Sequence, residues 1–381
     1  MGCLAYLNRG AADYAQGYAP NGEAHFYHGG SAIEWSKDDD RTWSHPVWVH
    51  PALSPSLYAP TAIPVVEQAS PWDRPVFIAD ASTGTIYVSG SGLAWTVDPA
   101  TVKRPPENPN LPSKGYEGYP PPTEARSRTF LRATHDEGRT WGMIYPMDDD
   151  EHPGGAFAGV GGFSAAHGHL VVAYSASKIP GPQGSTCPCT VFGASENDGK
   201  TFHYTVVPPL PKDDSAAAPP APGPRGFRRR VLISADPTSE GRYAVALAEG
   251  RRIMISLTED GGKTWLPPVV AVQLPSNATF GHLAMKYSPQ GKLGFIWKAM
   301  YPDRSFDVWS AMSLDHARSF KTVRVSHEVS PTYNPIRGNF LFGDDLSSLD
   351  IDSQYLYVVW GDNRSGFEGT WFGKVPLSAY E

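Results

Sequence analysis

One eight-residue pattern recurs along the chain and constrains its fold more than any other feature. A Ser or Thr is followed two positions later by Asp or Asn and four positions later by Gly, and the pattern closes with Thr and an aromatic residue. The three best copies span residues 134–141, 195–202 and 258–265, and two divergent copies span residues 36–43 and 313–320. Internal repeats at such spacings are typical of solenoids and propellers, so the sequence predicts an array of similar modules.

The residues of the pattern suit a tight turn. A short acidic side chain accepts hydrogen bonds from backbone N–H groups of its own turn, and Gly adopts positive φ at low steric cost. The Thr can bond back to the loop, and the aromatic residue closes the turn with an apolar contact. We therefore expect each copy to connect the last two strands of a β-meander. On this interpretation its aspartate holds the turn together and is neither a calcium ligand nor a catalytic acid.

The pattern resembles the Asp-box, or BNR repeat, of the sialidase-like β-propellers, and the resemblance covers nearly the whole chain. Three of the four spacings between copies are about sixty residues, which suits a four-stranded blade. The resemblance therefore implies an all-β fold, a single β-propeller over residues 1–381 with six blades and Asp-box hairpin turns. The sixth blade would lack the pattern, and its strands are expected at residues 346–352, 355–360 and 370–375.

Composition agrees with an all-β chain. The sequence contains 38 Gly and 37 Pro, and helical periodicity longer than two turns is hard to find. One long loop is expected at about residues 90–129 and a low-complexity loop at about residues 211–227. Both are interpreted as loops within one propeller domain, and no second domain is expected.

Charge and cysteine content limit the partners. A net charge of −7 and the lack of a basic stripe argue against nucleic acid, and no transmembrane run is present. The start of the chain resembles a mature protein without a signal peptide, and similar propellers are usually exported, so a secreted protein is expected. Two glycosylation sequons, at Asn277 and Asn363, fit a glycoprotein. Cys187 and Cys189 are too close for a standard zinc motif, and one of them could pair with Cys3.

In a propeller, the ligand site lies at one end of the central channel, in the loops that join blades and the loops between the two middle strands of each blade. The Asp-box turns belong to the opposite region. Several such loops combine aromatic, basic and acidic side chains, the mixture that sugar sites use. The catalytic candidates are Tyr333, Asp345, Asp362 and His282, and the substrate-binding candidates are Arg304, Arg337, Arg364, Trp72, Tyr301, Trp360 and Lys298. No metal or cofactor is expected.

Several candidates also have a structural interpretation. The Asp–Arg pairs at 303–304 and 362–364 recur in step with the blades, as salt bridges that brace loops do. His282 is equally compatible with a hydrogen-bonded core position. The acidic run at residues 148–152 is typical of a solvated loop.

The resemblance to sialidases does not extend to their catalytic groups. Sialidases grip the substrate carboxylate with three arginines, the first in an Arg-Ile-Pro phrase ahead of the first Asp-box, and use a Tyr activated by a Glu as nucleophile. Here the only arginine ahead of the first copy is Arg9, and the sequence contains no Arg-Ile-Pro. The resemblance therefore implies the fold but not sialidase activity.

Three functions remain open from the sequence. The first is a secreted glycoside hydrolase or lyase that acts at the end of an acidic glycan, with Asp345 or Asp362 as acid/base and Tyr333 as nucleophile or base. Arg304, Arg337 and Arg364 would then hold the substrate carboxylate. The second is a non-hydrolytic cyclase or pericyclic, Diels–Alderase-like enzyme of secondary metabolism. Its pocket would be lined by Trp72, Tyr301, Phe340 and Trp360. The third is a glycan-binding propeller without turnover. The expected partner is an oligosaccharide or another small molecule.

Overall fold

The computed structural model describes residues 3–9, 16–18, 24–26, 30–36, 38, 41–45, 47–50, 65–67, 73–96, 126–154, 162–179, 187–211, 231–332, 347–366 and 369–381. These residues form two compact units. Unit 1 comprises residues 1–159 and 196–202, and unit 2 comprises residues 160–195 and 203–381. Nearly all of the secondary structure in the described part is β, apart from a short 3-10 helix, η2 (Leu377–Tyr380).

Unit 1 begins with a small N-terminal sheet. Strand β1 (Cys3–Arg9) pairs with β4 (Gly30–Ser36), which pairs with β5 (Val47–His50), and all are antiparallel. The intervening strands β2 (Gln16–Tyr18) and β3 (Ala24–Phe26) pair with each other instead. The N-terminal sheet is therefore not a simple meander of consecutive strands.

The second sheet of unit 1 is organised around one long strand. Its strands are β6 (Val65–Glu67), β7 (Asp73–Ala79), β8 (Ile86–Thr96), β9 (Arg126–Thr134) and β10 (Tyr145–Pro146). The order is β10-β9-β8-β6, and β8 also pairs with β7 along its first half. Strands β8 and β9 extend into both ends of the loop expected at about residues 90–129, because their backbone pairing continues to Ala94 and Arg126.

Unit 2 contains four antiparallel sheets that follow one another along the chain. The first holds β11 (Phe163–Ala166), β12 (His169–Ala176), β13 (Cys189–Ser195) and β14 (His203–Val207). The second holds β15 (Val231–Ala235), β16 (Tyr243–Glu249), β17 (Arg252–Thr258) and β18 (Val269–Gln273). The third holds β19 (Thr279–Tyr287), β20 (Leu293–Met300), β21 (Ser305–Ser313) and β22 (Lys321–Arg324), and β23 (Ser330–Pro331) pairs with β21. The fourth holds β24 (Ser347–Ile351), β25 (Tyr355–Asp362) and β26 (Gly369–Pro376).

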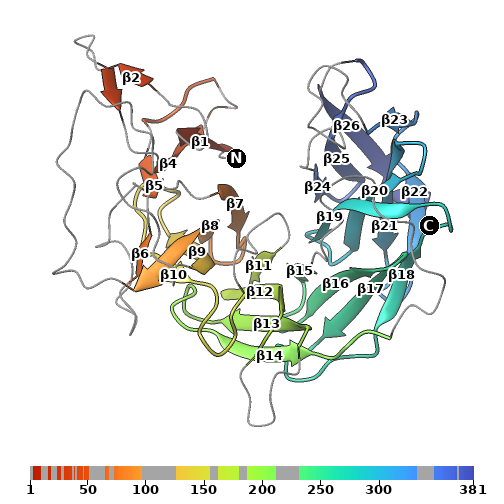
Figure 1. The fold of residues 1–381 in the computed structure, drawn as a ribbon, viewed down its shortest axis with the longest axis horizontal. Coiled ribbons are helices and arrows are strands. Elements are labelled where there is room, and N and C mark those ends of the chain that lie inside the picture. Colours follow the sequence, from red (N-terminus) through yellow and green to blue (C-terminus); the bar gives the residue numbers. More distant parts are fainter. Residues whose placement is uncertain are drawn as a thin grey trace. The chain divides into compact units, whose positions relative to one another are not determined.

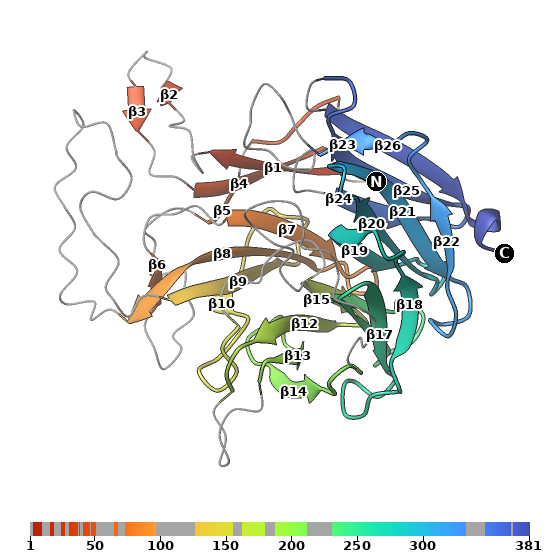
Figure 2. The same ribbon diagram turned by 45° about the vertical axis from the view of Figure 1, so that its right-hand side comes forward.

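The first strands of these four sheets lie next to one another. Strand β15 contacts β11, β19 contacts β15, and β24 contacts β19. In Figure 1 the sheets follow in this order from green to blue, and Figure 2 shows the same succession. Sheets that meet through their first strands are the blades of a β-propeller. The fold is therefore an all-β propeller, as the sequence predicted.

The prediction of six blades is wrong. Among the described residues, five sheets are built from strands that are consecutive in the chain, and these are the five blades. The N-terminal sheet differs because β1 skips the β2–β3 hairpin to pair with β4. The sequence prediction counted this region as a blade because residues 36–43 carry a copy of the repeat. The strands predicted for the last blade are confirmed as β24, β25 and β26.

Alternating side chains hold the last two blades together. In β25, Leu356, Val358 and Trp360 are buried, whereas the residues between them are more exposed. The buried side chains pack with Ile296 and Val308 of the preceding blade in one apolar cluster. Burial of each such side chain contributes about 1.5–3 kcal/mol. This packing holds in place the strand ends from which the neighbouring loops extend.

The five copies of the repeat are called here the repeated turns, and the four that carry an aspartate share one hydrogen-bonding scheme. Around Asp260, the backbone N–H of Thr264 donates to Oδ1 over 2.9 Å, the Thr264 hydroxyl to Oδ2 over 2.5 Å, and the Thr258 hydroxyl to Oδ1 over 2.8 Å. The same bonds form at Asp38, Asp136 and Asp315. These aspartates are thus confirmed as the residues that hold their own turns together.

Two further features bear on the sequence predictions. Cys187 and Cys189 form a disulfide with each other, so neither is bonded to Cys3. Within the described ranges, no helix has the length and apolar character needed to span a membrane.

Candidate functional site

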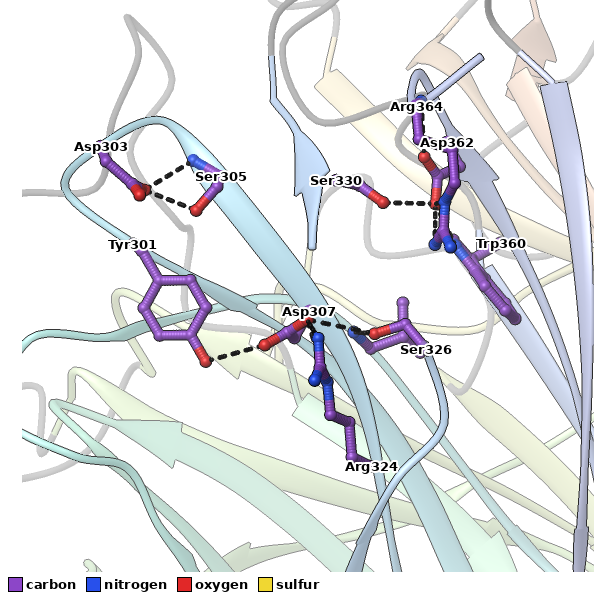
Figure 3. Close-up of polar contacts among 11 residues, drawn as sticks. Tyr301, Asp303, Ser305, Asp307, Arg324, Ser326, Ser330, Trp360, Asp362 and Arg364 are labelled. Carbon is purple, nitrogen blue, oxygen red and sulfur yellow. Dashed lines mark hydrogen bonds and ion pairs between the residues drawn. The ribbon is translucent and has the colours of Figure 1, made fainter. Parts of the chain in front are cut away.

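The candidate site lies at the end of unit 2 that carries the β20–β21 turn (residues 301–304) and the β25–β26 turn, of which residues 363–366 are described. We call this end the loop end. The repeated turn at residues 313–320 joins β21 to β22 and therefore lies at the opposite end of its antiparallel sheet. Figure 3 shows polar side chains at the loop end, gathered around Asp307 and around Asp362, with the Asp303–Ser305 contact apart from them.

Asp362 is the most enclosed acidic residue of the site, with none of its surface exposed. Its Oδ2 accepts hydrogen bonds from Ser330 Oγ over 2.6 Å, Trp360 Nε1 over 2.9 Å, and Arg364 Nε and Nη2 over 3.0 and 2.6 Å. Burial works to raise the pKa of Asp362, but the bonds from Arg364, Ser330 and Trp360 outweigh it and hold the pKa below its usual value. The carboxylate therefore stays ionised at neutral pH.

Arg364 is fixed in one orientation by these contacts. Its guanidinium lies 4.3 Å from the centre of the Trp371 ring, and its side chain is 11% exposed. Nε and Nη2 are engaged by Asp362, whereas Nη1 donates to no acceptor among the described residues. A cation–π contact and a carboxylate thus hold a cation whose third nitrogen remains available to a ligand.

Asp307 holds a second polar group. Arg324 donates to Asp307 Oδ1 through Nε over 3.2 Å and Nη2 over 2.5 Å, and Ser326 Oγ donates to the same oxygen over 3.2 Å. Tyr301 OH donates to Oδ2 over 3.3 Å. Burial and then the Asp307 charge raise the pKa of Tyr301. Tyr301 is therefore a neutral phenol that donates a hydrogen bond to Asp307.

The same kind of ion pair occurs in unit 1. There Arg128, near the start of β9, donates to the buried Asp148, just after β10, over 2.8 Å. In unit 2 the acid is at the start of β21 and the arginine at the end of β22, so Asp307–Arg324 is the same pair with its charges exchanged. Its recurrence between third and fourth strands argues that it braces the blade. It also corrects the expectation for residues 148–152, because Asp148 is buried and not part of a solvated loop.

The two Asp–Arg phrases seen in the sequence behave differently. Asp362 and Arg364 form the expected brace. In the other phrase, Asp303 accepts hydrogen bonds from the N–H and hydroxyl of Ser305, over 3.1 and 2.5 Å, and not from Arg304. Arg304 adopts a φ of +64° in an exposed turn, and its carbonyl accepts hydrogen bonds from Thr332.

Two of the predicted substrate-binding residues are inside the protein. Lys298 is 1% exposed; its Nζ donates to the Gly361 carbonyl over 2.9 Å and lies 4.7 Å from the centre of the Phe306 ring. Lys298 thereby links the last two blades. Trp360 is buried in the core between them. Both side chains therefore take part in the contact between the last two blades.

His282 occupies an irregular position in the first strand of its blade. The β19–β20 register shifts between Gly281 and Ala284, and His282 has a φ of +31° and is half-buried. Such bulges re-aim side chains and are common beside active sites. His282 therefore remains a candidate at the loop-end half of β19.

The remaining candidates lie outside the described residues. These are Trp72, Tyr333, Arg337 and Asp345, together with Phe340 of the cyclase alternative. Sequence reasoning missed Asp307, Arg324, Ser326 and Ser330. Their partners are 17–32 residues away in the chain, so no local spacing could reveal them. Within the described residues, no group of three or more His, Cys, Asp and Glu side chains could hold a metal ion.

Comparison with known proteins gives similarities of structure only. No known protein family and no curated protein matches the sequence. The fold is similar to the NanB sialidase of Streptococcus pneumoniae, with 9% identity, a TM-score of 0.49, and 100% of this chain and 67% of that chain covered. It is similar to an intramolecular trans-sialidase of Ruminococcus gnavus, with 13% identity, a TM-score of 0.47 and coverage of 98% and 91%. It is also similar to an alpha-L-arabinanase of Penicillium chrysogenum, with 13% identity, a TM-score of 0.39, and 81% of this chain and 94% of that chain covered. These similarities assign no activity and no residue to this chain.

Proposed function

We propose that this chain is a carbohydrate-active enzyme, a glycoside hydrolase or a lyase, that acts at the end of an acidic glycan. The observation that carries the proposal is the fixed guanidinium of Arg364, held by Asp362 and stacked on Trp371. A cation that is already oriented loses little conformational freedom when it binds a carboxylate. Its Nη1 would bind the acidic group of the terminal sugar.

In this proposal Asp362 positions Arg364 and does not transfer a proton. Its lowered pKa and its four hydrogen bonds through Oδ2 suit a permanent anion. We therefore assign the acid/base role to Asp345 and the role of nucleophile or base to Tyr333. Arg304 and Arg337 would complete the grip on the carboxylate, and His282 is the alternative base.

A carboxylate grip serves either reaction. Hydrolysis of a glycosidic bond needs two carboxyl groups, or a Tyr with an acidic partner, across that bond. A lyase needs a base that removes a proton next to the uronate carboxylate, and cations that neutralise the charge that develops there. The proposal names the acidic end of the substrate and leaves these two reactions to the experiment.

The test is incubation of the purified protein with sialosides, uronate-capped oligosaccharides and neutral glycosides, followed by mass spectrometry and ultraviolet absorbance. A released sugar that carries one added water establishes a hydrolase, and an unsaturated uronate establishes a lyase. We expect Arg364→Gln to lower kcat/KM on the acidic substrate at least about tenfold, the effect of one lost charged contact. The matched control is Arg128→Gln, which removes an arginine from a buried aspartate in unit 1. Intact glycans throughout would reject the proposal for the classes tested.

A second function, glycan binding without turnover, is favoured by one observation. Asp307 and Asp362, the buried carboxylates of the described site, are each paired with an arginine. Stoichiometric binding of an acidic glycan that is recovered intact would support this function over catalysis.

We also propose that the protein is exported. The Cys187–Cys189 disulfide supports this proposal, because disulfides persist mainly in oxidising compartments. Of the two sequons, Asn277 is exposed in a turn, whereas Asn363 is 3% exposed. A glycan is therefore proposed at Asn277 alone.

A further inference from the structure

Three uncharged polar groups at the loop end are buried without a hydrogen-bond partner among the described residues. They are the hydroxyl of Thr279, the hydroxyl of Ser347 and both polar atoms of the Asn363 carboxamide. Thr279 and Asn363 are 7% and 3% exposed. Burial of such groups without a partner costs free energy, so most buried polar groups in proteins are paired.

The three groups lie on neighbouring strands. Thr279 is the first residue of β19 and Ser347 the first of β24, and these two first strands are in contact. Ser347 pairs in register with Trp360, and Asn363 follows three residues later, at the end of β25. All three therefore stand at the loop end of their strands, and Asn363 lies between Asp362 and Arg364 in the chain.

We infer that Thr279, Ser347 and Asn363 form a subsite that binds the hydroxyl groups of a sugar ring. A sugar hydroxyl donates one hydrogen bond and accepts others, and it can therefore satisfy a protein hydroxyl or either end of a carboxamide. None of the three side chains is charged, so the subsite would bind hydroxyl groups of the sugar, whereas Arg364 would bind its acidic group. The inference deepens the proposed function and rests on it for the choice of a sugar as ligand.

An internal control exists at the other end of the same strand. Tyr287, the last residue of β19, also has a buried hydroxyl without a described partner, but it lies at the end of the repeated turns. One such group is therefore not in itself a site. The loop end differs because three such groups stand at the ends of neighbouring strands there.

The experiment measures binding without requiring turnover. Saturation-transfer NMR and titration with methyl β-galactoside, methyl β-glucoside and methyl β-glucuronide would compare wild type with Thr279→Val, Thr279→Ser, Asn363→Leu and Tyr287→Phe. We expect Thr279→Val and Asn363→Leu to weaken binding about tenfold, the effect of one hydrogen bond. Thr279→Ser and Tyr287→Phe should bind as wild type does. Melting temperatures would show that each variant is folded, and the Thr279 pair suffices if Asn363→Leu is not.

Several outcomes would overturn the inference. The first is failure of all three glycosides to bind the wild type. The second is binding by Thr279→Val that equals that of the wild type, since water would then satisfy the buried groups. The third is a loss of binding in Tyr287→Phe that equals the loss in Thr279→Val, since the buried groups would then affect stability only. Failure of the proposed function is separate. Cleavage of acidic glycans with unchanged binding in Thr279→Val would keep the enzyme and remove the subsite, and binding that requires Thr279 without cleavage would do the reverse.

Discussion

The carboxylates at the two ends of unit 2 are held in opposite ways. At the repeated-turn end, Asp260 is exposed and is bonded by residues no more than four positions away. At the loop end, Asp362 is fully buried, and one of its partners, Ser330, lies 32 residues away in the chain. The comparison shows that an acid in a local turn needs only its own segment, whereas an acid in the candidate site needs the assembled blades.

The largest effect that would test this comparison is the loss of Asp362. Asp362→Ala leaves the Arg364 guanidinium buried without its counter-charge, which should cost about 3–5 kcal/mol of unfolding free energy. Asp260→Ala in the exposed turn should cost much less. Urea denaturation of both variants would check this. Equal losses of unfolding free energy would mean that the Asp362–Arg364 pair stabilises the protein no more than a local turn does.

The next effect tests whether the side chains of the repeated turns also pack only within their own segment. Gly262 has a φ of +91°, and a Cβ atom there would collide with the ring of Phe192 in the preceding blade. Gly262→Ala should therefore lose about 2–4 kcal/mol, from overpacking and from left-handed strain. The neighbouring Gly261, with a φ of +77° and open space around it, is the matched control.

Gly261→Ala should show only the strain, about 1–2 kcal/mol. A Gly262→Ala variant no less stable than Gly261→Ala would contradict the contact with Phe192. The expected difference between the two would show that the turns bond internally but also pack against the preceding blade.

The difference between the repeated-turn end and the loop end accounts for which features could be predicted from the sequence. The repeated turns were recognisable because every bond of the Asp260 scheme lies within an eight-residue pattern. The strands of the last blade followed from alternating side chains such as Leu356, Val358 and Trp360. The number of blades was not predictable, because pairing of β1 with β4 across a hairpin leaves no periodic signal.

The candidate site was only partly predictable for the same reason. Arg364 and Asp362 were found because they are two positions apart and form a local pair. Lys298 and Trp360 were placed at the site by their position near loops, but the packing of two blades buries both. Asp307 and Arg324 were missed because the strands β21 and β22 bring them together, and sequence spacing does not.

A smaller effect concerns the edge of the site. Tyr301→Phe removes the hydrogen bond from its hydroxyl to Asp307, whose other oxygen is still held by Arg324 and Ser326. The expected loss is about 0.5–1 kcal/mol, the net value of one partly exposed hydrogen bond. Thermal unfolding would measure it. A loss as large as that of Asp362→Ala would show that Tyr301 is integral to the brace.

The smallest expected effect is a loss of stability at low pH. Hydrogen bonds from the side chain and backbone of Thr264 lower the pKa of Asp260 from its usual value of 3.8 to about 2. A carboxylate whose pKa is lower in the folded state stabilises the protein above the unfolded pKa, and this contribution is lost as pH falls through the folded value. The loss should therefore occur between about pH 4 and pH 2, and it should be small because the group is exposed and screened by salt.

The repeat supplies its own control for this pH dependence. The copy at residues 195–202 has Asn197, whose amide accepts from the Thr201 N–H over 3.0 Å and donates to the Thr201 hydroxyl over 2.9 Å. Asp260→Asn should make the stability profile between pH 4 and pH 2 flatter, and Asn197→Asp should make it steeper. Denaturant midpoints at several pH values would measure both. If Asn197→Asp left the profile unchanged, the turn would not be the source of the lowered pKa, and the acid sensitivity would have to come from buried acids such as Asp362.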